Sequence, residues 1–340
     1  MEAKPHDSEA PRNEELGAAR LKSRGVKAKA SCYRRGEESL MVRKLVTAIL
    51  LVCPALAFGQ TAMPTDYQGV LIALGKQGDF KDNVLRVNIP RNDLKVSIGG
   101  IATPTPFGFG GWLALTKGNG MDVMMGDLVL TEDEVNPVMS ALLTNGLDVT
   151  ALHNHFFYDT PRIYYMHVHG HGSPSELAAK VKPALALIGA HPPASTAAAG
   201  RAIDGNLDGA ALAKIVGYDG EQNGAVFKIT IGRPDIPLNE MGASINARMG
   251  LNTWAAFYGN DADAVVAGDV AMLDSEVTPV LKSLRSSGLD VVAIHHHMTG
   301  TQPTVIFLHY WGRGSAQKLA AAFRAAVDQT GARPKPSATR

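Results

Sequence analysis

The chain has 340 residues, of which 45% are hydrophobic, and its 33 Lys and Arg nearly balance its 32 Asp and Glu. This length and composition suit a globular protein of about two domains with a sizeable core. Residues 1–44 hold eleven basic and seven acidic residues, which leaves 22 basic and 25 acidic residues in the rest of the chain. Because the rest of the chain is slightly acidic, the composition argues against a nucleic-acid-binding protein and against one that binds an anionic membrane.

Residues 41–59 have the pattern of a signal peptide. Arg43 and Lys44 precede an apolar segment at 45–56 that is too short to span a membrane, and small residues then permit cleavage between Gly59 and Gln60. We therefore expect a periplasmic or secreted protein with no integral membrane span in the mature chain.

The polar residues 1–40 before this segment leave two interpretations open. They are either a misplaced gene start ahead of Met41 or an N-terminal extension before an internal anchor. Val52 and Pro54 flank Cys53 and make a poor lipoprotein signal, which favours a soluble product over a lipid anchor. Cys32 and Cys53 both precede the predicted cut, so a metal site in the mature chain must use His, carboxylate or backbone oxygen ligands.

The chain repeats itself with an offset of 142 residues. The segment LDVTALHNH at 147–155 matches LDVVAIHHH at 289–297, and the register holds without a gap from about residue 66 to 188. The sequence therefore predicts two copies of one unit, at 64–189 and 204–331, joined by a linker at 190–203 that is rich in small residues and Pro. A polar tail follows at 332–340.

Within the first copy, the hydrophobic pattern predicts helices and strands in a mixed order. Helices are expected at 66–74, at 131–144 with Thr131 as cap, and from Ser173 or Ser175 to 187. Strands are expected at 84–89, 93–98, 112–116, 121–130, 149–157 and 163–168, the last two as an antiparallel pair. The second copy repeats this order from about 210 to 330. The predicted fold class is α+β, with two tandem copies of one unit that has antiparallel sheets and flanking helices.

Nine of the ten histidines after residue 60 fall in two windows, one in each copy. Residues two apart on a strand share a face, so several imidazoles can converge where the paired strands meet. Imidazole suits Zn, Cu, Ni and Fe, and a three-histidine site keeps a position open for water or substrate. We expect one site in each copy, and the candidate ligands are His153, His155, His167, His169, His295, His297 and His309. Trp311 and Arg313 replace His169 and His171 in copy two.

Other repeated residues have a chemical and a structural interpretation. Asp127 and Glu134 are candidates to orient a ligand, to complete a metal site or to act as a base. Alternatively, Asp127 ends a strand at a turn and Glu134 belongs to a helix capping box. Arg91 is expected to form a local ion pair with Asp93, and Trp112 and its equivalent Trp254 are expected in the core.

The stretches PRNDL (90–94), GDLVL (126–130), EVNPVM (134–139), TALHNH (150–155) and YMH (165–167) resemble the LppY/LpqO-like family of exported bacterial proteins. The resemblance covers about residues 64–331. It implies export, a duplicated domain of unknown function and no assigned activity. Several members of that family are lipoproteins, and the poor lipoprotein signal here departs from them.

Three functions remain open at this point. The leading hypothesis is an exported protein that binds a transition metal, or a small-molecule ligand that depends on one, through its histidines. The second is a metal-dependent hydrolase in which Asp127 or Glu134 is the base. The third is an envelope binding or interaction module whose histidines are structural. The sequence contains no P-loop, dinucleotide-binding glycine motif or Gly-x-Ser-x-Gly elbow.

Overall fold

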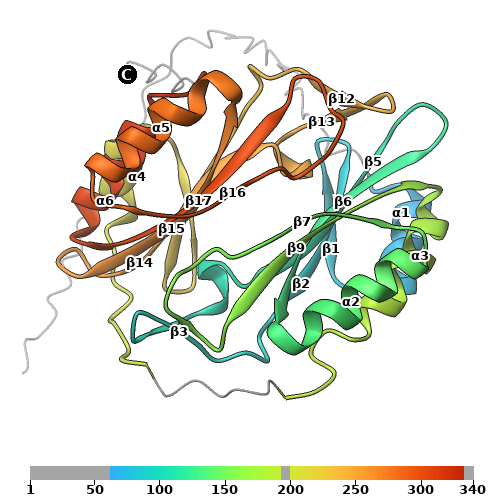
Figure 1. Ribbon diagram of the computed structural model, residues 1–340, viewed down its shortest axis with the longest axis horizontal. Coiled ribbons are helices and arrows are strands. Elements are labelled where there is room, and N and C mark those ends of the chain that lie inside the picture. The colour runs from blue at the N-terminus through green and yellow to red at the C-terminus, as the bar shows by residue number, and fades with distance from the viewer. Residues whose placement is uncertain (1–61, 193–199, 333–340) are drawn as a thin grey trace, which may run out of the picture. The chain divides into compact units, whose positions relative to one another are not determined.

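The computed structural model of the protein describes residues 62–192 and 200–332, which belong to one compact unit at 58–340. Two similar halves follow one another along the chain, and each contains an antiparallel sheet and three helices (Figure 1). The predicted α+β class, the duplication and the flanking helices are therefore confirmed. The expected signal peptide and the polar extension lie outside the described residues.

Copy one is built on a six-stranded antiparallel sheet of order β1-β2-β5-β6-β9-β7. Its strands are β1 (Gly78–Lys81), β2 (Val84–Pro90), β5 (Gly110–Lys117), β6 (Asp122–Thr131), β7 (Asp148–His153) and β9 (Ile163–Gly172). Its helices are α1 (Thr65–Leu74), α2 (Glu132–Thr144) and α3 (Pro174–Leu185). A small three-stranded sheet and a short 3-10 helix complete it, as β3 (Val96–Ile98), β4 (Ile101–Thr103), β8 (Asp159–Thr160) and η1 (Thr105–Phe107).

Copy two repeats this plan with the strand order β10-β11-β14-β15-β17-β16. Its main strands are β10 (Gly220–Asn223), β11 (Val226–Gly232), β14 (Asn252–Gly259), β15 (Ala264–Leu273), β16 (Asp290–His295) and β17 (Val305–Gly314). Its helices are α4 (Gly209–Val216), α5 (Asp274–Ser286) and α6 (Ala316–Val327). A hairpin and a 3-10 helix lie between β11 and β14, as β12 (Leu238–Glu240), β13 (Ala243–Ile245) and η2 (Ala247–Met249).

The helices cover the outer face of each sheet, and the inner faces of the two sheets pack against each other (Figure 1). Strand β6 shows the effect on sequence, because all ten of its residues are buried. Its side chains alternate, so that Met124 and Leu128 pack in the core under the helices while Met125 and Val129 pack in cores shared with copy two. A strand covered on both faces needs apolar residues at nearly every position, which explains the continuous apolar run of β6.

The predicted pair of strands forms, but β7 ends at His153 and not at residue 157. The side-chain nitrogen of Asn154 donates to the backbone oxygen of Ile163 at 2.7 Å, and the chain then leaves the sheet. His155 therefore lies in the loop after the strand, where strand alternation does not set its direction.

A buried ion-pair network fixes the start of α2. Arg91 donates to Glu134 at 2.6 Å and to Asp93 at 2.9 Å, and Glu134 accepts the backbone N–H groups of Thr131 and Gly189. The expected Arg91–Asp93 ion pair and the capping box at Thr131 are confirmed. These three partners give Glu134 a structural role.

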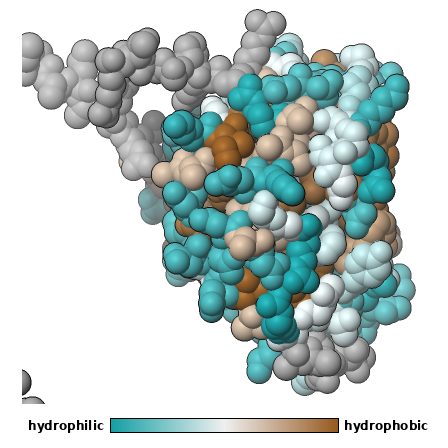
Figure 2. Space-filling view, turned by 90° about the vertical axis from the view of Figure 1, so that its left-hand side faces the viewer, coloured by the Kyte–Doolittle hydropathy of each residue, from teal (hydrophilic) through white to brown (hydrophobic). Residues whose placement is uncertain are grey.

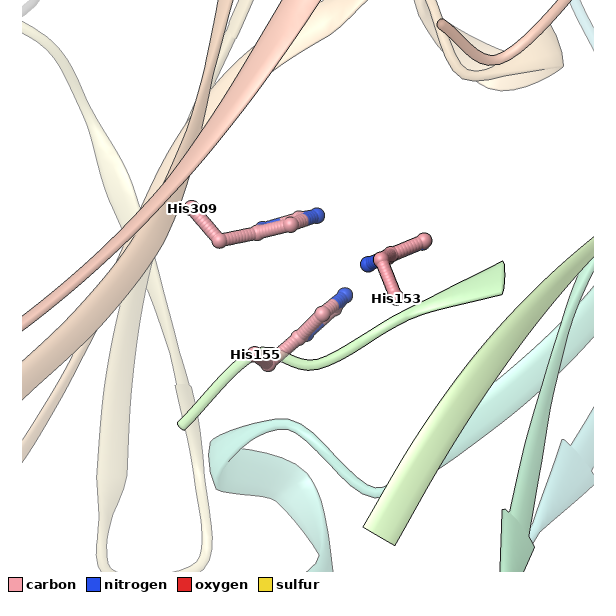
Figure 3. Close-up of side chains that lie close together, drawn as sticks. All are labelled: His153, His155 and His309. Carbon is pink, nitrogen blue, oxygen red and sulfur yellow. The ribbon is translucent and has the colours of Figure 1, made fainter. Parts of the chain in front are cut away.

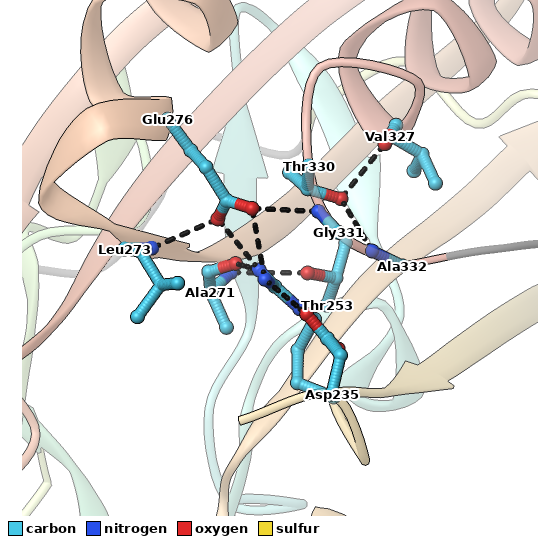
Figure 4. Close-up of polar contacts among 10 residues, drawn as sticks. Asp235, Thr253, Ala271, Leu273, Glu276, Val327, Thr330, Gly331 and Ala332 are labelled. Atoms are coloured by element: carbon cyan, nitrogen blue, oxygen red, sulfur yellow. Dashed lines mark hydrogen bonds and ion pairs between the residues drawn. The ribbon is translucent and has the colours of Figure 1, made fainter. Parts of the chain in front are cut away.

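The same network recurs in copy two around Glu276 (Figure 4). Arg233 donates to Glu276 at 3.0 Å and to Asp235 at 2.9 Å, and Glu276 accepts the N–H groups of Leu273 and Gly331. Each network joins the loop after β2 or β11 to a helix start and to the segment that follows the last helix of the copy.

The face of the molecule where α4 and α6 lie is mostly hydrophilic, with small apolar areas between the polar side chains (Figure 2). Among the residues that the structure describes, no helix is both long and apolar enough to cross a membrane.

Candidate metal centre

Strand alternation turns the histidines toward the interface between the copies. On β9, Met166 and Val168 pack in the core under the helices, so His167 between them faces the other sheet. On β17, Leu308 and Tyr310 lie in the helix-side core in the same way, and His309 faces copy one. The histidines are therefore directed away from the core of their own copy.

Six imidazole rings meet at this interface, three from each copy. Their ring centroids are 3.8 Å apart for His153–His295, 3.7 Å for His155–His309 and 4.0 Å for His167–His297. The second and third pairs are equivalent under the 142-residue offset. His155 of copy one corresponds to His297 of copy two, and His309 of copy two corresponds to His167 of copy one. The rings thus obey an approximate two-fold symmetry whose axis passes between His153 and His295.

The neighbours of the rings follow the same symmetry. His155 stacks on Tyr165 with centroids 3.4 Å apart, and its equivalent His297 stacks on Phe307 at 3.3 Å. Stacking on a fixed aromatic ring restricts the rotation of each imidazole and positions its nitrogen atoms.

Two groups of three histidines bring one ring nitrogen from each residue within 4.8 Å of one another. One group is His153, His155 and His309, whose rings point toward a common region (Figure 3). The other is His153, His167 and His295. Each group takes ligands from both copies, which differs from the expected arrangement of one site in each copy. The reason is that histidine rings of the facing copy lie nearer than those of the same copy, since the centroid of His153 is 3.8 Å from that of His295 and 5.0 Å from that of His167.

Several nitrogen atoms of the cluster face the interface without a partner. Nδ1 of His167 lies 3.1 Å from the backbone oxygen of Gly126, and Nδ1 of His309 lies 3.3 Å from that of Gly268. A ring that donates through Nδ1 to a backbone oxygen presents the lone pair of Nε2. Within the described residues, Nε2 of both rings and both nitrogens of His153 and His155 have no hydrogen-bond partner. Buried polar atoms are normally paired, so these atoms indicate a ligand.

Burial lowers the pKa of all six histidines, and repulsion between neighbouring rings lowers most of them further. Burial is the main cause that lowers the pKa of His309 to about 3, and the negative charge of Asp269 raises this pKa in part. The rings are therefore neutral at pH 7, and neutral imidazole is the form that binds metal ions.

Two buried aspartates border the cluster. Asp127 and Asp269 lie within β6 and β15, directly opposite His167 and His309 in the strand ladders, so Asp127 does not end a strand. The Nε2 atoms of His155 and His297 lie 3.9 Å and 3.5 Å from an oxygen of Asp127 and Asp269, respectively. Burial, and then repulsion by Asp269, raises the pKa of Asp127 to about 8. Carboxylates at this range can orient ligand rings.

A cavity of about 670 Å³ reaches the cluster from one side. The residues that line it include Asp127, Asp269, His155, His297, His309, Arg86, Lys228, Trp112 and Trp254. Arg86 lies 3.6 Å above the ring of Trp112, and Lys228 lies 4.2 Å above that of Trp254. The two tryptophans, which the sequence placed in the core, are half-buried walls of this cavity.

Sequence reasoning missed Arg86 and Lys228 as residues of this cavity, although the 142-residue offset relates them. Burial lowers the pKa of Lys228 to about 8. The two cations and the two aspartates make a polar cavity beside the six rings.

His169 lies apart from the six rings. Its Nε2 contacts Glu240 of copy two, and His171 lies beside the same carboxylate. His296, between two histidines of the cluster, is exposed.

The fold and the centre define a duplicated α+β protein with a candidate metal site between its copies. The chain belongs to the family described as Domain of Unknown Function (DUF1259), whose model matches residues 68–187 and 210–329. This match confirms a domain of unknown function in two copies, and the finer LppY/LpqO-like assignment stays a prediction. A comparison with curated proteins finds no match.

Solved structures give weak similarities. They include EtuB from Clostridium kluyveri, at 11% identity over 74% of this chain and 90% of that chain, with a TM-score of 0.19. The trimeric bacterial microcompartment shell protein PduB matches at 12% identity over 76% and 96%, with a TM-score of 0.20. Crystal form I of TP0453 matches at 10% identity over 75% and 96%, with a TM-score of 0.17. Similarities at these TM-scores carry no argument about function.

Proposed function

We propose that this protein is exported and binds one transition-metal ion in the histidine cluster between its two copies. The observation that carries the proposal is the set of six imidazoles from both copies, four of them buried and two half-buried, whose inward nitrogens lack partners within the described residues. Leaving so many buried acceptors and donors unpaired costs about 1–3 kcal/mol for each group, and a metal ion removes that cost.

The cluster favours one ion because His153 belongs to both ligand groups. An ion bound in one group removes His153 from the other, unless the ring bridges two ions. Nitrogen ligands without thiolates suit Zn, Cu, Ni and Fe, and the order of affinities among these ions favours Cu over the others.

Export is part of the proposal and rests on the sequence of residues 41–59. A positive segment, an apolar segment of signal-peptide length and small residues before Gln60 support it. The ligands predicted for the site are all histidines, which stay unoxidised where thiols form disulfides.

The first experiment expresses the full chain with its own N-terminal segment and measures bound metals by elemental analysis. The matched variants are His153→Ala, which removes the ligand common to both groups, and His296→Ala, which removes an exposed histidine. We expect the His153→Ala variant to lose one equivalent of metal and the His296→Ala variant to lose none. Equal metal content in the wild type and the His153→Ala variant would overturn the proposal.

The mass of the intact purified protein tests export. A mass that corresponds to a chain beginning at Gln60 would support export, and retention of residues 41–59 would contradict it.

A metal-dependent hydrolase is the second candidate, and the cavity beside the cluster favours it. Asp127 and Asp269 border both the cavity and the rings, and Arg86 and Lys228 offer positive charge to an anionic substrate.

Metal-loaded protein is assayed on carboxylic and phosphoric ester substrates, with Asp127→Asn and Glu134→Gln as variants. Turnover that Asp127→Asn abolishes without loss of metal would support a hydrolase. Metal-bound protein without turnover on these esters argues against it.

A structural role for the histidines, as in an interaction module, is a separate outcome of the first experiment. It predicts wild-type protein that carries no metal and takes up none of Zn, Cu, Ni or Fe.

A further inference from the structure

A second group of metal-ligating side chains lies outside the six-ring cluster. His169 and His171 are near the end of β9 in copy one, and Glu240 ends β12 in copy two. One ligand atom from each of these three residues lies within 4.8 Å of the others.

The contacts among the three residues converge on one carboxylate oxygen. Nε2 of His169 contacts Oε1 of Glu240, and Nε2 of His171 lies 3.3 Å from the same oxygen. The side chains of His169 and Glu240 are 9% and 12% exposed, so they are largely removed from water. The second oxygen of Glu240, Oε2, is buried and has no partner among the described residues.

The outer nitrogen of His169 also faces a carboxylate. Its Nδ1 lies 4.0 Å from Oδ2 of Asp148, the residue opposite it on the edge strand β7. This separation is longer than a hydrogen bond, but the exposed carboxylate of Asp148 adds negative charge beside the ring, which favours a bound cation.

The group exists at only one end of the interface. The residues equivalent to His169 and His171 in copy two are Trp311 and Arg313, and the residue equivalent to Glu240 in copy one is Ile98. Ile98 is buried and belongs to the apolar cluster against which Trp311 packs. One end of the interface is thus closed by apolar packing, and the other end is closed by a polar, ligand-bearing group.

We propose that His169, His171 and Glu240 form a second metal site, for zinc or another divalent transition metal, that fastens copy two to copy one. Two imidazoles and one carboxylate are a ligand set that zinc uses, with a fourth position left for water. The site would hold the β12–β13 hairpin against β9, and a backbone hydrogen bond from Asn119 to Met241 at 2.8 Å already places this hairpin against copy one. Its ligands come from both copies, so its metal stabilises their docking.

The experiment uses the full chain with the His153→Ala substitution, which removes the central site and leaves the outer one. Zinc alone is the probe, and its binding is measured by equilibrium dialysis after chelation, with the thermal unfolding midpoint as a second readout. We expect one equivalent of zinc and a higher midpoint with zinc than without it. Adding Glu240→Gln should weaken this binding at least about tenfold and remove the shift in the midpoint. Adding Glu221→Gln, at an exposed glutamate of β10, is the matched control and should change neither.

A folded His153→Ala protein that binds no zinc would overturn the outer site, because the three residues would then form only a hydrogen-bonded ion pair. Zinc binding that Glu240→Gln leaves unchanged would overturn it as well. If the His153→Ala protein does not fold, the pair of substitutions His155→Ala and His167→Ala replaces it, because this pair removes one ligand from each of the two central groups. The two proposals fail separately, because loss of the central site alone leaves the zinc that depends on Glu240, and loss of the outer site alone leaves the metal that depends on His153.

Discussion

The two copies of the domain are nearly equivalent at the centre of their interface and differ at its rim. At the centre, each contributes three histidines, one aspartate and one cation over a tryptophan, in matching contacts. At the rim, His169, His171 and Glu240 at one end correspond to Trp311, Arg313 and Ile98 at the other. A residue near a two-fold axis contacts the equivalent residue of the other copy, so the two must fit each other. Equivalent positions at the rim lie at opposite ends of the interface and do not touch, so each can change independently.

The largest expected effect tests whether the copies depend equally on their buried ion-pair networks. Arg91→Ala leaves the buried Glu134 without its cation, and Arg233→Ala does the same to the half-buried Glu276, so each should lower the free energy of unfolding by about 3–5 kcal/mol. Urea denaturation of the two variants measures this. A loss below about 1 kcal/mol in one copy alone would show that the equivalence of the copies does not extend to these networks.

The pH dependence of the metal-free protein tests the centre that both copies share. Histidines whose folded-state pKa lies below the ordinary value of 6.5 take up protons on unfolding, and for His309 this occurs between pH 6.5 and about 3. The free energy of unfolding should therefore fall as the pH drops below about 6.5, by up to about 1.4 kcal/mol per pH unit for each histidine.

Asp127 acts in the opposite direction, because its raised pKa makes it release a proton on unfolding between about pH 4 and 8. Six histidines should outweigh this effect. Urea denaturation at pH 7, 6 and 5 measures the balance, and His309→Asn should reduce the slope. Stability that is constant or rises toward pH 5 would contradict neutral, buried rings.

A smaller effect is expected when either of the two equivalent aspartates, Asp127 or Asp269, is substituted. Comparing the metal affinities of the two variants tests whether both copies support the centre equally. Asp127→Asn and Asp269→Asn keep the shape of the side chain and replace a carboxyl group that can ionise with an amide that cannot, beside His155 or His297. Each should weaken metal binding at the centre about 10–100-fold, as is typical when a residue that orients a ligand is changed. Competition with a chelator measures both affinities. Unchanged affinity in both variants would show that the aspartates do not orient the rings.

The smallest effect is expected at the rim of copy two. Arg313, where copy one has His171, forms an exposed ion pair with Asp263 at 2.8 Å. Arg313→Ala should change the free energy of unfolding by no more than about 1 kcal/mol, because water screens exposed pairs. The same denaturation assay tests it, and a loss of several kcal/mol would assign Arg313 a role in docking the copies.

Much of the fold follows from local patterns in the sequence. The 142-residue repeat, the first helix ending at residue 74, the capping box at Thr131 and the cap at Ser173 are readable from the chain, and all are present in the structure. The end of β7 was not readable, because it depends on a hydrogen bond from Asn154 to a strand nine residues away.

The sequence predicted which residue types form the candidate site, but not which histidines form a ligand group together. Strand alternation places His167 on one face of β9, but it does not say that this face meets the second copy. Glu240 carries no local signal at all, since it is 69 residues from His171 and its partner lies in the other copy. Contacts between distant segments depend on how the two sheets dock, and hydrophobic periodicity does not encode that docking.

The chain can be regarded as a dimer whose subunits are covalently joined. The central cluster takes half of its rings from each copy, and residues 190–203 keep the halves together at an effective concentration in the millimolar range expected for short tethers. The metal affinity proposed for this centre would therefore be independent of protein concentration in the intact chain. Two separated copies would have to find each other in solution, so their affinity for metal would rise with concentration. Copy one alone would hold two of the three ligands of either group, and copy two alone would hold one.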